Sequence, residues 1–349
     1  MFYEEFTILM EFDVVIIGAG PGGLHCGKLL SEGGARVLIL EKNELIGKKV
    51  CAGGVTWNGF MDRIPHEIIE QSFQSQKIVT TYQSLKISRP HPIVATVNRQ
   101  NLGKYMAAAA QKSGARLAPG AYVETITDSK VHYRYQGNRY EAGYSYLAGA
   151  DGSMSKVRSH LGLKTNFYGI GINYNYSGNY PEMVWNFNPE LFGCGYSWIF
   201  PHRTNSSIGV YAGNSKMTPA LLDSNLKRWL SGLGIELKNS KIEAEKICID
   251  FHGWKFGNKF LIGDAGGFTS PLTGEGIYPA IVSAEAVSHS ILYRQEAHPD
   301  LDKVINKHKK HKMMVQLAGT SNLLATFLSE LTAFMLRSGV ISFEKFEMV

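Results

Sequence analysis

One stretch near the beginning of the chain limits the available folds more than any other. Four apolar residues in a row follow Asp13, which predicts a strand buried on both faces, as in parallel sheets. A glycine-rich turn comes next, and a helix is expected over residues 22–32. Residues 35–40 then have the pattern of a second buried strand. The order strand, turn, helix, strand predicts a parallel α/β unit.

The glycines of the turn follow the spacing Gly18-x-Gly20-x-x-Gly23, and Gly22 opens the expected helix. Gly18 permits a tight turn, Gly20 lets the backbone approach a pyrophosphate, and Gly23 lets helix and strand pack closely. Phosphates would bind the N–H groups at the N-terminus of the helix. Glu41, at the tip of the second strand, can accept hydrogen bonds from a ribose diol and disfavours a ribose 2′-phosphate. The unit therefore predicts binding of FAD or NAD.

Length and composition set the remaining limits. The 349 residues suffice for one large or two modest domains, and Met10 is an alternative start to Met1. We expect no secretory signal and no membrane span, because no basic segment precedes an apolar core and no window of roughly 20 uncharged residues occurs. The net charge of +6 is modest, and no nucleic-acid partner is expected. A reducing, cytoplasmic setting without a metal site is expected, because no metal-ligand spacing relates Cys26, Cys51, Cys194 and Cys248.

A glycine-rich loop, residues 47–54, follows the second strand and contains Cys51. It is either a flexible turn with a buried cysteine or a loop that presents a thiol over the reactive end of the cofactor. In the second interpretation, Lys48 and Lys49 would lower the pKa of the thiol. Arg99 then precedes a helix expected over 102–112, and alternating residues with turn signals predict an antiparallel meander over 122–146.

The middle of the chain, about 165–250, is rich in aromatic residues with a period of two. Runs at 170–176, 183–187, 196–200 and 208–211 predict an antiparallel sheet, with one helix near 221–230. Such aromatic residues form either an ordinary core or an apolar binding surface.

The buried-strand pattern returns at 259–262 and ends in Gly263-Asp264. An aspartate there can bind a sugar-alcohol hydroxyl, and the N-terminus of a helix expected over 277–292 can face an anion. Together with the first glycine unit, these features favour FAD, the longer cofactor. No second complete Gly-x-Gly-x-x-Gly occurs, so we expect NAD(P)H to approach from the substrate side or a reduced electron-carrier protein to supply electrons.

Further motifs carry a resemblance to a known family. The segment 149–158, Gly-Ala-Asp-Gly-Ser-x-Ser-x-Val-Arg, is similar to the second signature of the para-hydroxybenzoate hydroxylase superfamily, and Gly263-Asp264 is similar to its third. Residues 51–54, 196–201 and 270–277 resemble motifs of the geranylgeranyl reductase family. The resemblance runs in order from about residue 12 to 292. Departures occur at Ala52 and Gly103, where the family usually has glycine and aspartate, and at Gly193, where it has proline.

The resemblance implies a flavoenzyme that saturates carbon–carbon double bonds of isoprenoid chains. It implies an α/β fold, with a Rossmann-like FAD-binding domain of the glutathione reductase type, an inserted antiparallel substrate domain and a short C-terminal helical segment. The matching positions imply that Cys51, Tyr196 and Trp198 lie at the reacting end. The cofactor-binding positions that the motifs imply are Gly18, Gly20, Gly22, Gly23, Glu41, Lys42, Cys51, Ala52, Gly53, Arg99, Asp151, Arg158, Gly263, Asp264, Pro271, Gly274, Glu275, Gly276 and Ile277.

The expected FAD-binding domain comprises 12–80, 98–164 and 251–296, the substrate domain comprises 81–97 and 165–250, and 297–349 is helical. Two other functions remain open. A flavin hydroxylase or halogenase would use the same scaffold with oxygen, and a carrier would hold lipid beside a structural FAD. Tyr196, Trp198 and Phe200 share one strand face and point either into a chain-binding tunnel or into the core.

A basic run at 307–312 precedes an apolar segment that residues 319–322 interrupt, which predicts two helices. They form either a lid with solvated lysines or a peripheral anchor on the inner face of a membrane. The anchor would place Lys307, Lys309, Lys310 and Lys312 on anionic head groups.

Overall fold

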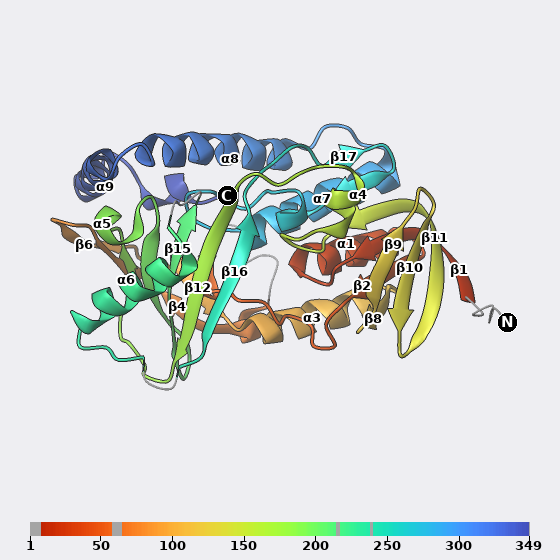
Figure 1. Ribbon diagram of the computed structural model, residues 1–349, viewed down its shortest axis with the longest axis horizontal. Coiled ribbons are helices and arrows are strands. Elements are labelled where there is room, and N and C mark those ends of the chain that lie inside the picture. The colour runs from red at the N-terminus through yellow and green to blue at the C-terminus, as the bar shows by residue number, and fades with distance from the viewer. Residues whose placement is uncertain (1–7, 58–64, 214–216, 238–239, 349) are drawn as a thin grey trace.

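Two sheets lie toward opposite ends of an elongated molecule, with helices between and above them (Figure 1). The computed structural model describes residues 8–57, 65–213, 217–237 and 240–348. Within these ranges the strands form sheets of eight, seven and three strands. The expected α/β class, with a Rossmann-like part and a second, largely antiparallel sheet, is confirmed.

The eight-stranded sheet contains the glycine unit. Its path is β17-β18-β11-β1-β2-β8, and the pairs among β18, β11, β1, β2 and β8 are parallel. The expected meander adds β9 and β10 in antiparallel pairs beside β11. The bounds are β1 (Ile8–Ile17), β2 (Val37–Glu41), β8 (Arg116–Pro119), β9 (Tyr122–Ile126), β10 (Lys130–Tyr135), β11 (Asn138–Gly149), β17 (Lys255–Phe256) and β18 (Lys259–Leu261).

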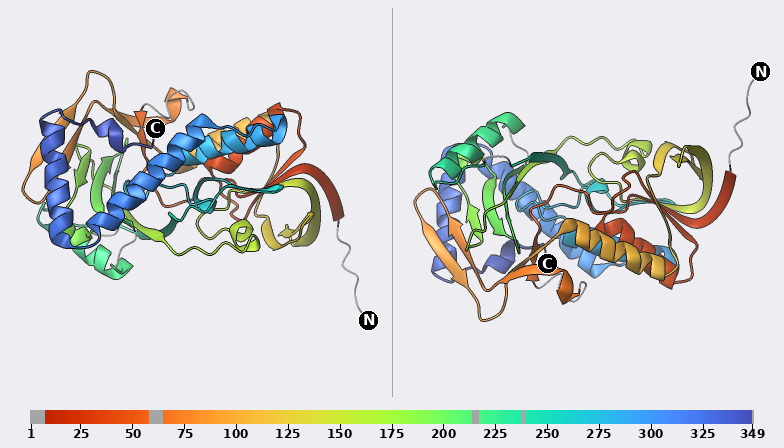
Figure 2. Two further views of the ribbon diagram at one scale, coloured as in Figure 1. Left: turned by 90° about the horizontal axis from the view of Figure 1, so that it is seen from above. Right: turned by 90° about the horizontal axis from the view of Figure 1, so that it is seen from below.

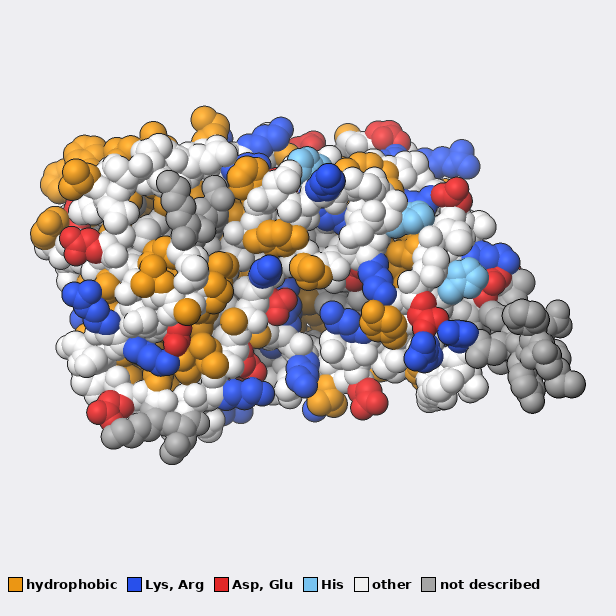
Figure 3. Space-filling view, in the orientation of Figure 1, with side chains coloured by type: hydrophobic (Ala, Val, Ile, Leu, Met, Phe, Trp, Pro, Cys, Tyr) orange, Lys and Arg blue, Asp and Glu red, His pale blue; other side chains and the backbone are white. Residues whose placement is uncertain are grey.

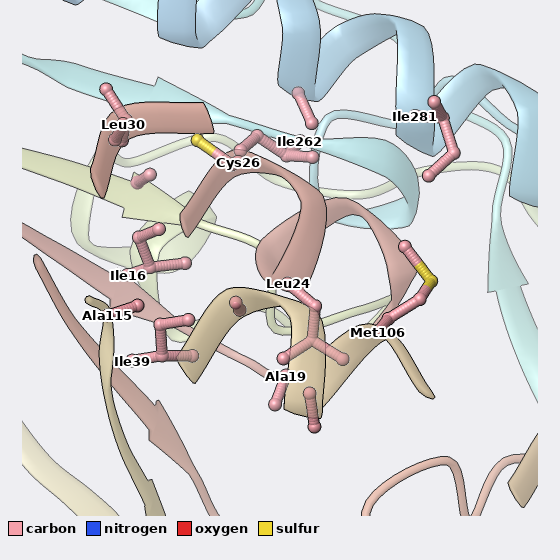
Figure 4. Close-up of a cluster of buried hydrophobic side chains, with 14 of the residues drawn as sticks. Ile16, Ala19, Leu24, Cys26, Leu30, Ile39, Met106, Ala115, Ile262 and Ile281 are labelled. Carbon is pink, nitrogen blue, oxygen red and sulfur yellow. The ribbon is translucent and has the colours of Figure 1, made fainter. Parts of the chain in front are cut away.

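The helix α1 (Pro21–Glu32) begins one residue before the expected start and packs between α3 (Arg99–Lys112) and α7 (Ile277–Tyr293). Figure 4 shows Leu24, Cys26 and Leu30 of α1 in one cluster with Ile16 and Ile39 of the sheet. These side chains are almost completely buried, and each large one stabilises the fold by about 1.5–3 kcal/mol. The core therefore fixes the N-terminus of α1 at the carboxyl ends of β1 and β2.

The seven-stranded sheet has the order β16-β12-β15-β14-β13-β5-β6. All its pairs are antiparallel except β13 with β5, and α6 (Pro219–Ser231) covers one face. The four expected aromatic strands are present. The bounds are β5 (Ser75–Val79), β6 (Ser84–Ser88), β12 (Tyr168–Tyr176), β13 (Val184–Asn186), β14 (Tyr196–Pro201), β15 (Ser206–Gly213) and β16 (Ile242–Cys248).

Two details differ from the expected domain boundaries. Strand β5 pairs with β13, so the boundary expected at residue 80 falls within a hairpin of the second sheet. Strand β7 (Val94–Val97) pairs with β3 (Gly54–Thr56) and β4 (Ile69–Phe73), which connects the chain on both sides of that boundary. Strand β6 lies within the expected substrate domain, whereas β5 contains no aromatic residue and was placed in the FAD-binding domain.

After α7 come α8 (Pro299–Ala318) and α9 (Asn322–Arg337), the two helices expected from the interruption at 319–322. They meet at a corner of the molecule beside the second sheet (Figure 2). The remaining short elements are α4 (Lys156–His160), α5 (Pro189–Phe192) and 3-10 turns at His66–Ile68, Gly263–Ala265 and Phe343–Phe346. Among the described residues, no helix combines the length and apolarity needed to cross a bilayer.

Candidate functional site

A cavity of about 880 Å³ runs from the glycine turn, past the carboxyl ends of β1 and β2, to the aromatic strands and α9. Most of the positions that the sequence implied for the cofactor line this cavity, although they come from distant segments. The exceptions are Gly23, Gly53, Arg158 and Pro271, which do not line it.

The glycine turn forms one end of the cavity. Gly18 has a φ of +102°, and a Cβ there would lie 2.3 Å from the Ala150 carbonyl oxygen, so this turn requires glycine. Gly20 is the N-cap of α1 and has no side-chain cap, and a Cβ there would meet no atom closer than 4.0 Å. The backbone N–H groups of the first turn therefore face open space, which suits a phosphate.

Gly23 contributes by packing, as expected for the third glycine. A Cβ at this position would lie 2.0 Å from the Gly18 carbonyl oxygen. Gly22 also lines the cavity. A Cβ at this position would lie 2.5 Å from Cγ2 of Ile262, so the absence of a side chain leaves room for Ile262.

Glu41 lines the cavity at the tip of β2. Its Oε2 accepts a hydrogen bond from the Ala19 N–H at 2.8 Å, and its Oε1 accepts from the Asn43 N–H at 2.9 Å. These bonds fix the carboxylate beside the glycine turn, the place expected for a ribose acceptor. Lys42 lines the cavity next to it.

Two buried polar groups on the cavity wall lack partners. The Nε and Nη1 atoms of Arg99, at the start of α3, have no hydrogen-bond partner among the described residues, and neither has Oδ1 of Asp151. Burial raises the pKa of Asp151, although Oδ2 accepts from the Lys156 N–H at 2.6 Å. Unpaired buried polar groups cost free energy, so these atoms indicate a polar ligand with both anionic and hydroxyl groups.

Asp264 also lines the cavity, just after β18. Burial raises its pKa, but the ammonium of Lys49, 2.5 Å from Oδ2, and a bond of 2.6 Å from Thr269 Oγ1 outweigh burial, so the pKa is lowered. One of the two interpretations of the loop had Lys48 and Lys49 acting on the thiol of Cys51. The structure pairs the Lys49 ammonium with the Asp264 carboxylate.

The loop that carries Lys49 and Cys51 is held against α3. A Cβ at Gly103 would lie 2.8 Å from the Gly47 Cα, so the glycine that replaces the family's aspartate makes room for the loop. His202 lies between the Glu70 carboxylate and the Ala52 carbonyl oxygen, which fixes the far side of the loop. The sequence gave no sign of this contact, since His202 and Ala52 are 150 residues apart.

Arg158 and Pro271 support the site from behind. The guanidinium of Arg158 is buried and donates to the carbonyl oxygens of Ala265, Lys164 and Asp250, so we find no direct role for it in binding the cofactor. The Pro271 carbonyl oxygen accepts from the Tyr211 hydroxyl at 3.1 Å. Gly53 provides a turn with a φ of +76°. By contrast, Gly263, Gly274, Glu275, Gly276 and Ile277 line the cavity.

The aromatic side chains of β14 form the next part of the wall. Tyr196, Trp198 and Phe200 all line the cavity, with successive ring centroids 6.0 Å apart. Trp185 of β13 packs against this row, 4.7 Å from the Phe200 ring. The rings thus pack with one another and face the cavity at once.

The polar atoms of these rings are bonded within the protein. The Tyr196 hydroxyl donates to the Thr273 carbonyl oxygen at 2.6 Å, and Trp198 Nε1 donates to Ser207 Oγ at 3.0 Å. Burial, followed by nearby Glu275 and Cys51, raises the pKa of Tyr196. Cys51 lines the same space, and its Sγ accepts from the Gly53 N–H at 3.4 Å. This part of the cavity therefore offers ring surface and the thiol of Cys51.

The far wall comes from residues beyond 300, for which the motifs gave no prediction. Phe343, Phe346 and Glu347 line the cavity, and the Met348 N–H donates to Glu275 Oε2 at 2.9 Å. Burial and the nearby Glu275 raise the pKa of Glu347 to about 8. Side chains of α8 and α9 complete the wall: Met314, Leu317, Leu328, Thr332 and Leu336.

The residues at the polar end fit FAD. The N-terminus of α1 and Arg99 suit the pyrophosphate, Glu41 suits the adenosine ribose, and Asp264 suits the sugar-alcohol chain. Within the described ranges, no group of three or more His, Cys, Asp and Glu residues could hold a metal ion.

Comparisons with known proteins agree with this fit. A family model described as an FAD binding domain matches residues 11–176. An uncharacterized protein of Methanosarcina barkeri is 30% identical over 302 residues, which cover 81% of this chain and 76% of that protein. A Rhodobacter capsulatus protein named geranylgeranyl diphosphate reductase is 27% identical, over 78% of this chain and 72% of that protein. FAD is therefore the cofactor.

Solved structures share the fold. A geranylgeranyl bacteriochlorophyll reductase-like protein from Thermoplasma acidophilum has a TM-score of 0.77 at 18% identity, over 92% of this chain and 91% of that chain. The flavin-dependent brominase Bmp2 has a TM-score of 0.67 at 18% identity, over 94% and 90%. At such identities the likeness shows the fold and not the reaction. The FAD model and the sequence relatives show that the chain belongs to the family of FAD-dependent oxidoreductases that includes proteins named geranylgeranyl reductase.

Proposed function

We propose that this protein reduces carbon–carbon double bonds of an isoprenoid chain of the geranylgeranyl type. The observation that carries the proposal is that Cys51 and the aromatic face of β14 line the same cavity as the FAD-binding groups. The name of the Rhodobacter capsulatus relative supports the same class of substrate.

The chemistry divides between the cofactor and the chain's own residues. FAD, when reduced, supplies the hydride. An isolated alkene is not polarised, so its reduction needs close placement, a proton and exclusion of water. Tyr196, Trp198 and Phe200 would hold a flexible apolar chain by burying its surface, at about 25 cal/mol per Å². The Tyr196 hydroxyl already donates its proton to the Thr273 carbonyl oxygen. It therefore does not donate to water at this wall, and an apolar chain has little bound water to displace.

Cys51 is proposed to bound the reacting end and to deliver the proton from Sγ. Its thiol lines the cavity close to Tyr196, whose pKa it influences. The rival interpretation, a small residue selected for its size, remains the alternative, because free cysteine often packs simply as a hydrophobic side chain.

We propose that the electrons come from NAD(P)H or from a reduced electron-carrier protein. The chain has no second complete Gly-x-Gly-x-x-Gly, so a nicotinamide would have to approach the flavin through the open part of the cavity. Reduction of the bound FAD by NADPH, NADH or reduced ferredoxin, followed by absorbance without oxygen, distinguishes these donors.

The test is a single-turnover reaction. The purified FAD-bound protein is reduced without oxygen and mixed with a geranylgeranyl compound, and the product is analysed by mass spectrometry. Reoxidation of the flavin together with addition of two hydrogen atoms to the chain is the expected result. If the flavin reoxidises only when oxygen is admitted and the added ligand gains oxygen or halogen, the enzyme is a monooxygenase or halogenase. An unchanged ligand under both conditions would leave only a carrier function.

A further inference from the structure

Helix α9 is apolar on its outer side. Leu323, Phe327, Leu331 and Phe334 recur at intervals of three and four residues, so they share one face of the helix. They are 86%, 61%, 40% and 60% exposed. Figure 3 shows hydrophobic side chains gathered at the corner where Figure 1 places α9. We call these four residues, with the exposed Met313, Met314 and Leu317 at the end of α8, the outer apolar face.

The inner side of α9 is also apolar, because it forms cavity wall. Ala325, Leu328 and Leu336 line the cavity. A helix that covers a core normally presents polar residues to water, and a large exposed apolar patch marks an interaction surface. Helix α9 therefore separates two apolar environments, the cavity on one side and whatever covers the outer apolar face on the other.

The cavity reaches the outer apolar face at the end of α8. Met314 and Leu317 line the cavity and are nevertheless 40% and 53% exposed. The α8–α9 turn also meets the loop after α5, where a Cβ at Gly319 would lie 3.2 Å from the Cys194 Sγ. Cys194 lines the cavity as well. The wall is thus one side chain thick at this point.

The charge around the outer apolar face is positive. Lys309 and Lys310 are exposed on α8, about one turn before Met313 and Met314. Between residues 304 and 343 the only acid is Glu330, and its carboxylate accepts hydrogen bonds from the Tyr82 N–H and the Gln83 amide. Cations beside an exposed apolar face complement anionic lipid head groups over acyl chains.

Two of the four lysines that the anchor interpretation placed on head groups turn inward instead. Lys312 Nζ lies 3.5 Å from Asp250 Oδ1 and 4.6 Å from the centroid of the Phe167 ring. Lys307 is partly buried and interacts with Glu275 and Glu347. The part of the basic run that can meet head groups is therefore Lys309 and Lys310.

We propose that the outer apolar face docks on the surface of a bilayer containing anionic lipid, with Lys309 and Lys310 at the head groups. Helix α9, at about 1.5 Å per residue, is too short to span a bilayer and would lie along its surface. Docking places Met314 and Leu317 against the acyl chains. If the proposed function holds, an isoprenoid chain passes into the cavity there without crossing water.

Flotation of the full-length FAD-bound protein tests the docking. The vesicles are phosphatidylcholine alone, or phosphatidylcholine with about a third replaced by phosphatidylglycerol. We expect flotation with the anionic vesicles, weakened by salt and about tenfold weaker with neutral ones. The combined variant L323Q, F327Q and F334Q, and the double variant K309Q and K310Q, should each lower partitioning by about tenfold or more. Unchanged FAD absorbance verifies that these variants fold.

Matched controls lie on other surfaces. Leu221 and Leu233 near α6 are also about half exposed, and Lys303 is an exposed lysine on α8 that pairs with Asp300. The variants L221Q with L233Q, and K303Q, should float like the wild type. Absence of flotation, or flotation that the α9 variants leave unchanged, overturns the proposal. A dimer in light scattering that the α9 variant converts to a monomer, without flotation, would instead assign the face to a second copy.

The proposed docking and the proposed function can each be contradicted by experiment without affecting the other. Protein that floats but does not reduce a detergent-dispersed isoprenoid retains the docking and loses the function. Protein that reduces the dispersed substrate but does not float retains the function and loses the docking.

Discussion

Two glycines in the cofactor turn make room for different groups, one for the protein's own backbone and one for a ligand. Substitutions at the two positions distinguish these roles. Gly23 makes room for the protein's own backbone, because a Cβ there would lie 2.0 Å from the Gly18 carbonyl oxygen. Gly20 has an ordinary φ of −73°, and a Cβ there would meet no protein atom closer than 4.0 Å. Contacts within the protein therefore do not require glycine at this position, whereas a ligand that approaches the backbone does.

We therefore expect Gly20→Val to fold and to lose FAD. The valine side chain would occupy the space where a pyrophosphate approaches the backbone, so affinity for FAD should fall at least about a hundredfold. Flavin absorbance of the purified protein, with circular dichroism for the fold, measures both quantities. Gly23→Val is the comparison and should lose folded protein. A yellow Gly20→Val variant with the wild-type FAD content would contradict this account of the turn.

Cys51→Ser tests the proposed proton delivery. Serine nearly keeps the volume but has a far higher pKa, so the rate of alkene reduction should fall at least about tenfold while FAD content stays constant. Single-turnover kinetics without oxygen measures the rate. Cys248 is buried at the end of β16 and does not line the cavity, so Cys248→Ser should react like the wild type. If Cys51→Ser also reacts at the wild-type rate, only packing remains as the role of this cysteine.

Strand β14 is the element that places aromatic rings on the cavity. Its alternation sends Trp198 to the cavity and Ile199 to the opposite face, where Ile199 belongs to a separate core with Phe192 and Leu222. A Cβ at Gly209 on the neighbouring strand would lie 2.3 Å from the Trp198 ring, so that glycine lets the indole lie across β15. Truncation on each face should thus have a different consequence.

Trp198→Ala should weaken binding of an apolar chain about tenfold or more and leave FAD bound, because the lost ring contributes cavity surface. Ile199→Ala is the matched truncation on the same strand. Both should lower the free energy of unfolding, by about 2–5 kcal/mol, but Ile199→Ala should leave chain affinity unchanged. Quenching of tryptophan fluorescence is unsuitable after removal of Trp198, so binding is measured by calorimetry. Equal losses of affinity in both variants would indicate general destabilisation.

Local elements could be predicted because each has a short-range pattern. The apolar run before Gly18, the alternation from Tyr196 to Phe200 and the interruption before Asn322 each correspond to an observed element. Strand β6 lies in the expected substrate domain, but β5 could not be assigned to the second sheet, because its partner, β13, lies over 100 residues away and its own residues are mostly polar. Register and partner choice depend on tertiary packing, which the pattern within a strand does not encode.

At the scale of the whole molecule, the cavity is closed by chain that no cofactor motif contains. Residues 343–348 cross the cavity at Glu275, where the Met348 N–H binds Oε2 and Glu347 is nearly fully buried. The pairing of Lys49 with Asp264 is likewise a contact across 215 residues. The cofactor residues could be inferred from motifs, whereas both contacts join segments far apart in the sequence. The contact at Glu275 also depends on how the chain after residue 296 packs.

Glu347 makes this closure dependent on pH. Burial, then the nearby carboxylates of Glu275 and Glu344, raises the pKa of Glu347 to about 8 from an ordinary 4.5. The folded state therefore binds the Glu347 proton more tightly than the unfolded state. The contribution of this proton to the free energy of unfolding is fully present below about pH 4.5 and is lost as the pH rises through about 8. Between about pH 5 and 8 the free energy of unfolding should fall by about 1–3 kcal/mol more in the wild type than in Glu347→Gln. Urea titrations at both pH values measure the difference, and parallel pH profiles would contradict the buried placement of Glu347.

The close approach of the Gly18 and Ala150 backbones also has a consequence for biosynthesis. The two backbones approach closely, so the observed shape of the glycine turn requires that β1 and β11 are paired. Arg99, Asp151 and Asp264 then complete the cofactor site from three later segments. A chain still emerging from the ribosome cannot hold FAD firmly until residues near 277 are free to fold. The availability of FAD to the cell would then determine how many finished chains reach the folded state, a quality check that acts after translation and before any encounter with substrate.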